Sequence, residues 1–247
     1  MEDSLFQDYS KKHVHFYDET FPALIELGLT MISDIEKPSI VDLGCGDGGL
    51  LLALYKKGLL NGFSEIIGVD ISPKRIERLA KEMPFIKRMV SDASNVQNCS
   101  SSFFDFIICS QVIEHVRNDV ALVAEFKRLL KGSGVAFISS VIKRWYGVYF
   151  YSYNGICKLD PTHIREYSSS REFVSLMQTK DFEVIDVRTH GIKFPILDLL
   201  LRLLIKFGLI EPDAGFFKKY KSLGVLREFR VPIIGYKHVE VLVRKIE

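Results

Sequence analysis

Apolar residues along this chain follow two alternating patterns. Short runs rich in Val and Ile, each bounded by turn residues, are typical of buried strands. Such runs are "SIVDLGC", "EIIGVDI", "IKRMVSD", "FDFIICS" and "GVAFISSVI". Between them, apolar residues recur at the spacing of a helix, over residues 20–35, 50–57, 74–83 and 119–131. Strands alternating with helices predict an α/β fold, with a doubly wound and mostly parallel sheet that helices cover on both faces.

The last third of the chain departs from this alternation. Two more strand-like runs, "FEVIDVRTH" and "HVEVLVRKI", are separated by far more residues than a hairpin loop needs. We therefore expect a single domain over residues 1–247, with an inserted cap segment over 192–235. The N-terminal stretch, residues 1–35, is expected to fold over the ligand site as a helical lid. A solvated terminus is the alternative.

The inserted segment contains the most apolar run of the chain, residues 194–210. Asp198, Arg202 and Lys206 recur in it at every fourth position, which predicts one charged stripe on a helix and argues against a membrane span. Two interpretations are open. The segment is either a cap that shapes an acceptor pocket, or an interfacial helix that makes peripheral membrane contact through residues 194–230 and presents a lipid-linked acceptor.

The charge balance and the cysteines limit the partners and the compartment. Lys and Arg number 33 against 31 Asp and Glu, a net charge of +2, so no nucleic-acid partner is expected. The four cysteines form no C-x-x-C pair, which favours a reducing compartment. The N-terminus is acidic and polar, where a secretory signal is basic and then apolar. We expect a cytoplasmic protein.

A glycine-rich loop follows the first predicted strand in "VDLGCGDGGL". Gly44, Gly46 and Gly49 satisfy the G-x-G-x-x-G pattern of dinucleotide enzymes. Asp42, however, puts a negative charge where a pyrophosphate would be repelled and an ammonium group would be attracted. The chain also contains no Tyr-x-x-x-Lys pair. The loop therefore suits a zwitterionic amino-acid group, and a nicotinamide-dependent oxidoreductase is disfavoured.

Two more acids follow the next two predicted strands. Asp70 stands where a carboxylate can accept both hydroxyls of a ribose, and Asp92 where it can accept the exocyclic amine of adenine. Each of them alone is also a common turn residue. Their coincidence with Asp42 and the glycine loop favours a nucleoside ligand that carries an amino group.

The motifs "VDLGCGDGG", "GVDIS", "SDAS" and "FDFIICSQVIEHV" resemble successive motifs of the class I S-adenosylmethionine-dependent methyltransferases, most closely the type 11 group with the ubiquinone-pathway O-methyltransferases. The resemblance implies a Rossmann-like, seven-stranded sheet with an antiparallel last strand, and S-adenosylmethionine as cofactor. It also implies roles for residues at the strand ends. The methionine part would be lined by Asp42, Gly44, Gly46, Ser110 and Gln111, the ribose bound by Asp70, and the adenine contacted by Ile71, Asp92 and Ala93.

Methyl transfer from a sulfonium needs alignment of the reacting atoms, and it needs a base only if the acceptor must lose a proton. The catalytic candidates are Glu114, His115 and His163. Relatives in the resembled group have Glu where Gln111 stands, and there the acids and histidines can gather a divalent metal. A carboxamide is a weaker, neutral ligand, so we expect no metal here.

A structural role is the alternative for these candidates. Glu114 and His115 would then begin the helix after the fourth strand, where the helix dipole favours an acid. His190 and His238, in or beside the last strands, are expected to be structural.

These patterns together predict a methyltransferase that acts on oxygen of a small-molecule or lipid-linked acceptor. A catalytically silent subunit, which binds the cofactor and stabilises a partner, is the alternative from another class.

Overall fold

The computed structural model describes most of the α/β core and parts of the insertion. Its described residues are 20–147, 160, 162–179, 181–195, 197, 198, 200, 201, 204, 207, 209, 210, 220–226 and 229–246. Most of the predicted lid, residues 1–19, lies outside the described residues. So do Arg202 and Lys206 of the predicted charged stripe.

Seven strands pair into one sheet, as the alternating pattern predicts. In chain order they are β1 (Ser39–Leu43), β2 (Glu65–Asp70), β3 (Lys87–Val90), β4 (Phe104–Ser110), β5 (Leu130–Lys143), β6 (Phe182–Pro195) and β7 (Arg230–Lys245). Their order across the sheet is β3-β2-β1-β4-β5-β7-β6. The last strand, β7, runs antiparallel to both of its neighbours, and the pairs from β3 to β5 are parallel. The doubly wound, mostly parallel fold is confirmed.

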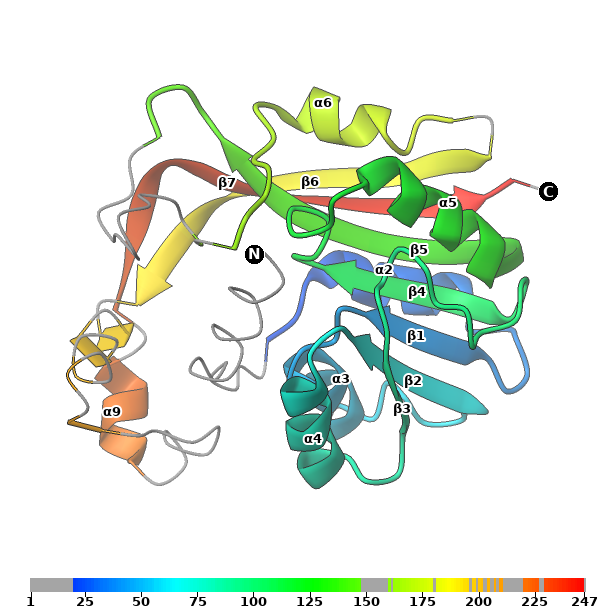
Figure 1. Ribbon diagram of the computed structural model, residues 1–247, viewed down its shortest axis with the longest axis horizontal. Helices are drawn as coiled ribbons and strands as arrows, with labels where there is room; N and C mark the ends of the chain where they lie inside the picture. The colour runs from blue at the N-terminus through cyan, green and yellow to red at the C-terminus, as the bar shows by residue number, and fades with distance from the viewer. Residues whose placement is uncertain are drawn as a thin grey trace.

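The helices cover both faces of this sheet. They are α2 (Ala23–Met31), α3 (Gly49–Lys56), α4 (Pro73–Glu82), α5 (Asp119–Leu129), α6 (Ser170–Ser175) and α9 (Lys221–Leu226). In Figure 1, α5 and α6 lie over one face and α2 lies behind the sheet. Side-chain caps fix three helix starts, because Ser72 accepts from the N–H of Arg75, Asn118 from that of Ala121 and Ser169 from that of Glu172. No helix among the described residues is long and apolar enough to cross a membrane.

The apolar strands supply a core on each side of the sheet. Along β4, Phe106 and Ile108 join the core beneath α2, α3 and α4, while Ile107 and Cys109 join the core beneath α5 and α6. Successive side chains of a strand point to opposite faces, so a continuous apolar run fills both cores. This burial on both faces stabilises the sheet. Because the strands from β3 to β5 are parallel, their carboxyl ends lie along one edge of the sheet.

The insertion is shorter than the sequence indicates. β6 continues to Pro195 and β7 begins at Arg230, which leaves residues 196–229 between them. The outer ends of both strands bend away from the sheet and carry α9 (Figure 1). The alternation of apolar and polar residues does not extend into these outer ends, because they carry exposed apolar residues such as Ile234.

Burial in the insertion does not follow its charged stripe. Among the residues that the structure describes, Asp198 is buried and Leu200 is 53% exposed, whereas Leu201 is only 4% exposed. A member of the charged stripe thus packs inward.

Candidate functional site

The glycine loop lies where the strand order of the sheet reverses. β1 pairs with β2 on one side and with β4 on the other, and ligands of doubly wound sheets bind at such a switch point. Gly44 has φ +77°, and a Cβ there would lie 2.2 Å from Cγ2 of Val112, in the loop after β4. Glycine therefore allows the two loops to meet at this edge.

Asp70, the last residue of β2, holds the glycine loop. Its Oδ2 accepts from the backbone N–H of Gly46 at 2.9 Å, and its Oδ1 accepts from that of Ser72 at 2.8 Å. Burial raises the pKa of Asp70, and the nearby Arg75 together with these two hydrogen bonds only partly opposes the rise. The role of Asp70 toward a ribose stays a prediction, and the carboxylate also has this structural role.

Asp42 is a buried acid beside Asp70. It is 2% exposed, and burial, followed by repulsion from Asp70, raises its pKa to about 8. Two buried carboxyl groups at one strand edge disfavour negative charge on both. A bound cationic group would offset this repulsion, so the site fits the ammonium end of an amino-acid ligand.

The other predicted cofactor residues lie at the same strand edge. Ile71 follows β2 and is half-exposed, while Ala93 follows β3 and is buried. Asp92 accepts from the N–H of Ser94 at 2.8 Å and from its hydroxyl at 2.7 Å. Ser110 ends β4, with its hydroxyl 3.1 Å from that of Ser139. The structure thus brings these residues to one edge, and their contacts with a cofactor remain predictions.

Glu114 lies in the loop between β4 and α5. That helix begins only at Asp119, with Asn118 as its cap, so the expectation that Glu114 begins it is wrong. The helix starts later because Asn118 caps it. The side chain of Asn118 accepts from the backbone N–H of Ala121, in the first turn of α5. Instead Glu114 is fully buried, and its Oε2 accepts from the hydroxyl of Ser140 at 3.0 Å.

Backbone hydrogen bonds bring His163 to Glu114 from a distant part of the sequence. The N–H groups of Ile164 and Arg165 donate to the carbonyl oxygen of Glu114, at 2.9 and 3.3 Å. The guanidinium group of Arg165 donates to three more carbonyls of this loop. Tyr167 forms a bridge with Ile142 at the end of β5. These contacts fix residues 162–167 against the loop after β4.

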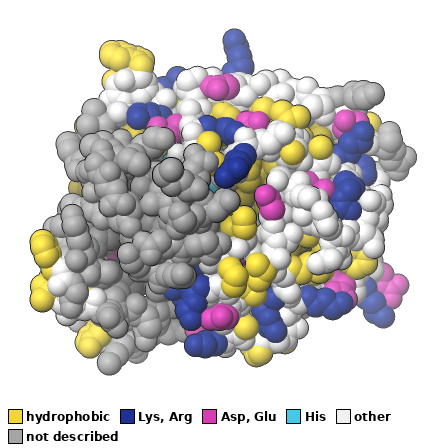
Figure 2. Space-filling view, in the orientation of Figure 1, with side chains coloured by type: hydrophobic (Ala, Val, Ile, Leu, Met, Phe, Trp, Pro, Cys, Tyr) yellow, Lys and Arg dark blue, Asp and Glu magenta, His cyan; other side chains and the backbone are white. Residues whose placement is uncertain are grey.

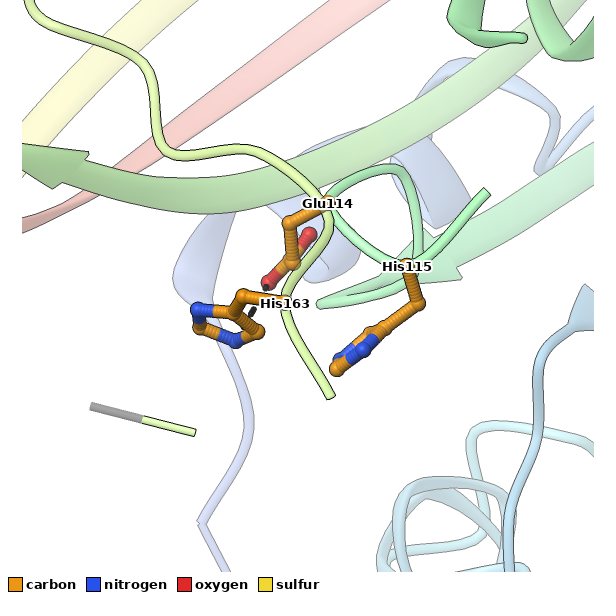
Figure 3. Close-up of side chains that lie close together, drawn as sticks. All are labelled: Glu114, His115 and His163. Atoms are coloured by element: carbon orange, nitrogen blue, oxygen red, sulfur yellow. Dashed lines mark ion pairs between the residues drawn. The ribbon is translucent and has the colours of Figure 1, made fainter. Parts of the chain in front are cut away.

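Glu114, His115 and His163 form one cluster (Figure 3). Nε2 of His163 lies 4.0 Å from Oε1 of Glu114, and the two imidazole rings are 4.8 Å apart. Nδ1 of His115 lies 3.1 Å from the carbonyl oxygen of Thr162. The hydroxyl of Thr162 lies at the same distance from Nδ1, but it donates its proton to Asp160. Both oxygens near Nδ1 therefore accept, so Nδ1 carries the proton and the lone pair of a neutral ring lies on Nε2.

The protonation state of His115 is set mainly by the removal of its ring from water. Burial lowers its pKa, while the charge of Glu114 opposes this effect and His163 adds to it; Asp160 and the Thr162 carbonyl also favour the protonated form. The ring is therefore neutral at pH 7. A neutral imidazole near two carboxylates can accept a proton, and those carboxylates stabilise the cation that results.

This cluster has ligand atoms that a cation could bind, since one atom of each of the three side chains lies within 4.8 Å of the others. Gln111 bears on that possibility. In the amide orientation that satisfies its neighbours, its NH₂ donates to Oε1 of Glu114 at 3.3 Å and its oxygen accepts from Nδ1 of His238 at 3.3 Å. A donor thus faces Glu114 where a metal would need an acceptor. The absence of a metal stays a prediction.

Three residues outside the predicted set of Glu114, His115 and His163 lie around this cluster. His238 contacts Gln111, Glu166 lies 3.8 Å from His163, and Asp160 accepts from the hydroxyl of Thr162 at 2.6 Å. Asp160 and Glu166 stand in the same short stretch as His163, which was the available signal. For His238 no local signal existed, because its contact depends on how β7 pairs.

The fold and the site define the class of the protein. A doubly wound sheet with a glycine loop at the switch point, and acids after three successive strands, is the architecture of a class I S-adenosylmethionine-dependent methyltransferase. A family model described as a methyltransferase domain matches residues 12–187, well over half of the chain. The chain belongs to this family, and the cofactor of its methyltransferase domain is S-adenosylmethionine.

Individual relatives agree with this assignment. The chain is similar to the ubiquinone biosynthesis O-methyltransferase of Actinobacillus pleuropneumoniae, with 28% identity over 110 residues that cover 41% of this chain and 45% of the relative. The match thus spans less than half of the length of that curated relative.

Solved structures show the same fold at low identity. One is a SAM-dependent methyltransferase of Methanosarcina mazei, with a TM-score of 0.60 and 16% identity over 92% of this chain and 98% of that one. Another is geranyl diphosphate C-methyltransferase of Streptomyces coelicolor, solved with Mg²⁺, geranyl diphosphate and S-adenosyl-L-homocysteine. Its TM-score is 0.55 and its identity 14%, over 91% of this chain and 79% of that one.

Proposed function

We propose that this protein transfers a methyl group from S-adenosylmethionine to an oxygen of a small-molecule or lipid-linked acceptor. The observation that carries the proposal is a neutral, half-buried His115 beside Glu114, in the loop that follows β4 at the cofactor edge. A hydroxyl acceptor must lose its proton during transfer, and a positioned base assists that step. The curated relatives named as O-methyltransferases support oxygen as the acceptor atom.

The residues of this chain would divide the work between binding and proton transfer. When bound, S-adenosylmethionine supplies a methyl group on a positively charged sulfur. Asp42 and Asp70 hold the cationic nucleoside at the switch point. His115 accepts the acceptor's proton at Nε2, and Glu114 and Asp160 stabilise the imidazolium. Burial of Glu114 keeps water from this side of the site, which strengthens these electrostatic interactions.

Exposed apolar side chains at the outer end of the sheet support a lipid-linked acceptor. Trp145 is 95% exposed, and the N–H of Arg144 donates to the carbonyl of Gly235, which places the turn around Trp145 beside exposed Ile234. Aromatic and apolar side chains next to basic ones favour a membrane interface. Figure 2 shows one face, where hydrophobic side chains reach the surface among mixed Lys, Arg, Asp and Glu. We propose a cytoplasmic protein with peripheral membrane contact and no nucleic-acid partner.

A product assay tests this function. The protein is incubated with S-adenosylmethionine that carries a deuterated methyl group, and with phenols that either lack or carry a polyprenyl chain in vesicles. We expect an O-methyl ether with the deuterium label, and one S-adenosylhomocysteine for each product. Tight cofactor binding without S-adenosylhomocysteine from any acceptor would instead identify a catalytically silent cofactor-binding subunit.

A further inference from the structure

A line of charged side chains leads from the end of β5 into the catalytic cluster. Nζ of Lys143 lies 3.2 Å from Oε2 of Glu166. Oε1 of Glu166 lies 3.8 Å from Nδ1 of His163, and Nε2 of His163 lies 4.0 Å from Oε1 of Glu114. The ring of His163 is thus placed between two carboxyl groups, one at each nitrogen.

The line is too deeply buried to be explained as surface charge. The side chains of His163 and Glu166 are 5% and 10% exposed, and that of Glu114 is 1% exposed. Burial alone would raise the pKa of Glu166, but attraction to His163 and to Lys143 outweighs it, so the pKa is lowered. Glu166 is therefore a carboxylate at pH 7. Apolar side chains of similar volume would usually stabilise such a position at least as well.

The backbone anchors this segment independently of Glu166. The N–H groups of Ile164 and Arg165 donate to the carbonyl oxygen of Glu114, and the N–H of Lys143 donates to the carbonyl of Tyr167. These bonds flank Glu166 on both sides in the sequence. Its carboxylate is thus not needed to hold residues 162–167 in place, and its contact with the ring of His163 requires a separate explanation.

We propose that Glu166 is a positioning residue of the methyl-transfer site, which fixes the ring of His163 and thereby the carboxylate of Glu114 beside His115. Lys143 holds Glu166 from the other side. Without this restraint the ring of His163 can turn, and Glu114 keeps only its contacts with Ser140 and Gln111. This inference rests on the proposed function, and its own prediction concerns how one ring is held.

The first experiment measures the ring directly and needs no acceptor. The six histidines of the full chain are labelled with ¹⁵N, and the ring nitrogens are observed by long-range proton–nitrogen NMR. The His163→Asn variant assigns the His163 signals. Glu166→Gln keeps the shape and removes the charge, while Glu172→Gln, an exposed change in α6, is the matched control. We expect Glu166→Gln to move the His163 signals and the control to leave them in place.

The second experiment measures transfer on the same preparations, with the labelled cofactor and the phenol panel of the product assay. A misplaced catalytic group costs about 10- to 100-fold in rate. We expect that loss in kcat for Glu166→Gln, with the KM for S-adenosylmethionine within about 2-fold of wild type because its site is untouched. Combined with His163→Asn, Glu166→Gln should cause no further loss, since both changes break one connection.

The outcomes separate the two claims. Unchanged His163 signals in Glu166→Gln would overturn the inference, whatever the activity. Moved signals with an undiminished kcat would overturn the positioning role. If the signals move while the wild-type protein methylates none of the phenols, the proposed function fails and the hold of Glu166 on His163 is supported.

Discussion

Nδ1 of His238 donates to the carboxamide oxygen of Gln111 at 3.3 Å, which joins β7 to the loop after β4. Burial, followed by repulsion from His190, lowers the pKa of His238 to about 4, so its ring is neutral at pH 7. With its oxygen engaged, Gln111 turns its NH₂ toward Glu114. A residue of the last strand thus determines which group of Gln111 faces the catalytic cluster.

This orientation predicts that transfer is independent of metal. Activity should survive treatment with EDTA, because the NH₂ of Gln111 faces Glu114 where a cation would need an oxygen. Gln111→Glu should raise the affinity for divalent ions, measured by calorimetry with magnesium and zinc chloride, because it adds a carboxylate to a cluster of suitable ligands. Complete loss of wild-type activity in EDTA, restored by magnesium or zinc, would show that the enzyme needs a metal.

We predict that Asp42 lowers the folding stability of the cofactor-free protein as the pH rises toward 8. Its pKa rises from 3.8 to about 8 in the folded state, so between these values the folded state binds the extra proton and stability falls as pH rises. Asp42→Asn removes this dependence. At a pH near 8 its Tm should exceed that of wild type by several degrees, at about 2–4 °C per kcal/mol. Differential scanning calorimetry across this range measures the effect.

The substitution Asp42→Asn should also weaken binding of the cofactor. The carboxyl group can ionise when the ammonium group binds, whereas the amide cannot, so we expect the Kd for S-adenosylmethionine to rise about tenfold, near 1.4 kcal/mol. An Asp42→Asn variant that melts lower than wild type near pH 8, or binds the cofactor unchanged, contradicts this account.

Asp70→Ala should weaken cofactor binding by about 1.5–3 kcal/mol, the range for hydrogen bonds to a charged group. The loss has two sources, because Asp70 is expected to accept from the ribose and also holds the N–H of Gly46. Titration calorimetry with S-adenosylhomocysteine measures it, and NAD serves as a ligand that should not bind. Unchanged affinity in Asp70→Ala, or measurable NAD binding, would refute the assignment of this edge.

Two neighbouring leucines of the insertion provide a matched pair. Leu201→Asp places a charge at a buried position and should lower the free energy of unfolding by about 2–5 kcal/mol. Leu200→Asp, at a half-exposed position, should change it by less than about 0.5 kcal/mol. Urea denaturation compares the two variants. Equal destabilisation by both would mean that this helix packs differently from the structure described.

The apolar outer end of the sheet is predicted to bind membranes. Trp145→Ala and Ile234→Asp should each weaken binding to vesicles that contain phosphatidylglycerol, because each removes exposed apolar surface. Val120→Asp, which alters an exposed apolar residue of α5, is the control and should bind normally. Sedimentation with vesicles measures the bound fraction. If all three variants and wild type sediment alike, this surface is not a membrane contact.

The parallel core was predictable because its signal is local. β1, β2, β4 and β5 contain apolar runs between turn residues, and burial on both faces needs no more information than that. The edge strand β3 is only partly buried. The positions of Asp42, Asp70 and the glycine loop were predictable from a local signal as well. Each lies at the end of a strand-like run, and the carboxyl ends of parallel strands lie at one edge of the sheet.

The remaining features depend on contacts between distant parts of the chain. His163 reaches Glu114 through the backbone bonds of Ile164 and Arg165. Their spacing in the sequence does not indicate this contact, and only the family resemblance groups the two residues. The burial of Asp198 in the insertion is likewise not indicated by its charge or its spacing. A histidine in a strand gives no sign of what it faces across the sheet, so the contact of His238 with Gln111 is not predictable from the sequence.

The central claim is that His115 acts as the base at a site for S-adenosylmethionine. The most direct test measures binding and transfer together in His115→Asn, with His190→Asn as the exposed-histidine control. We predict a kcat about 10²–10⁴-fold below wild type, the usual contribution of a positioned base. The Kd for S-adenosylmethionine should stay the same, and the control should retain wild-type values of both. Undiminished transfer by His115→Asn, or a loss of binding equal to its loss of rate, would contradict the account.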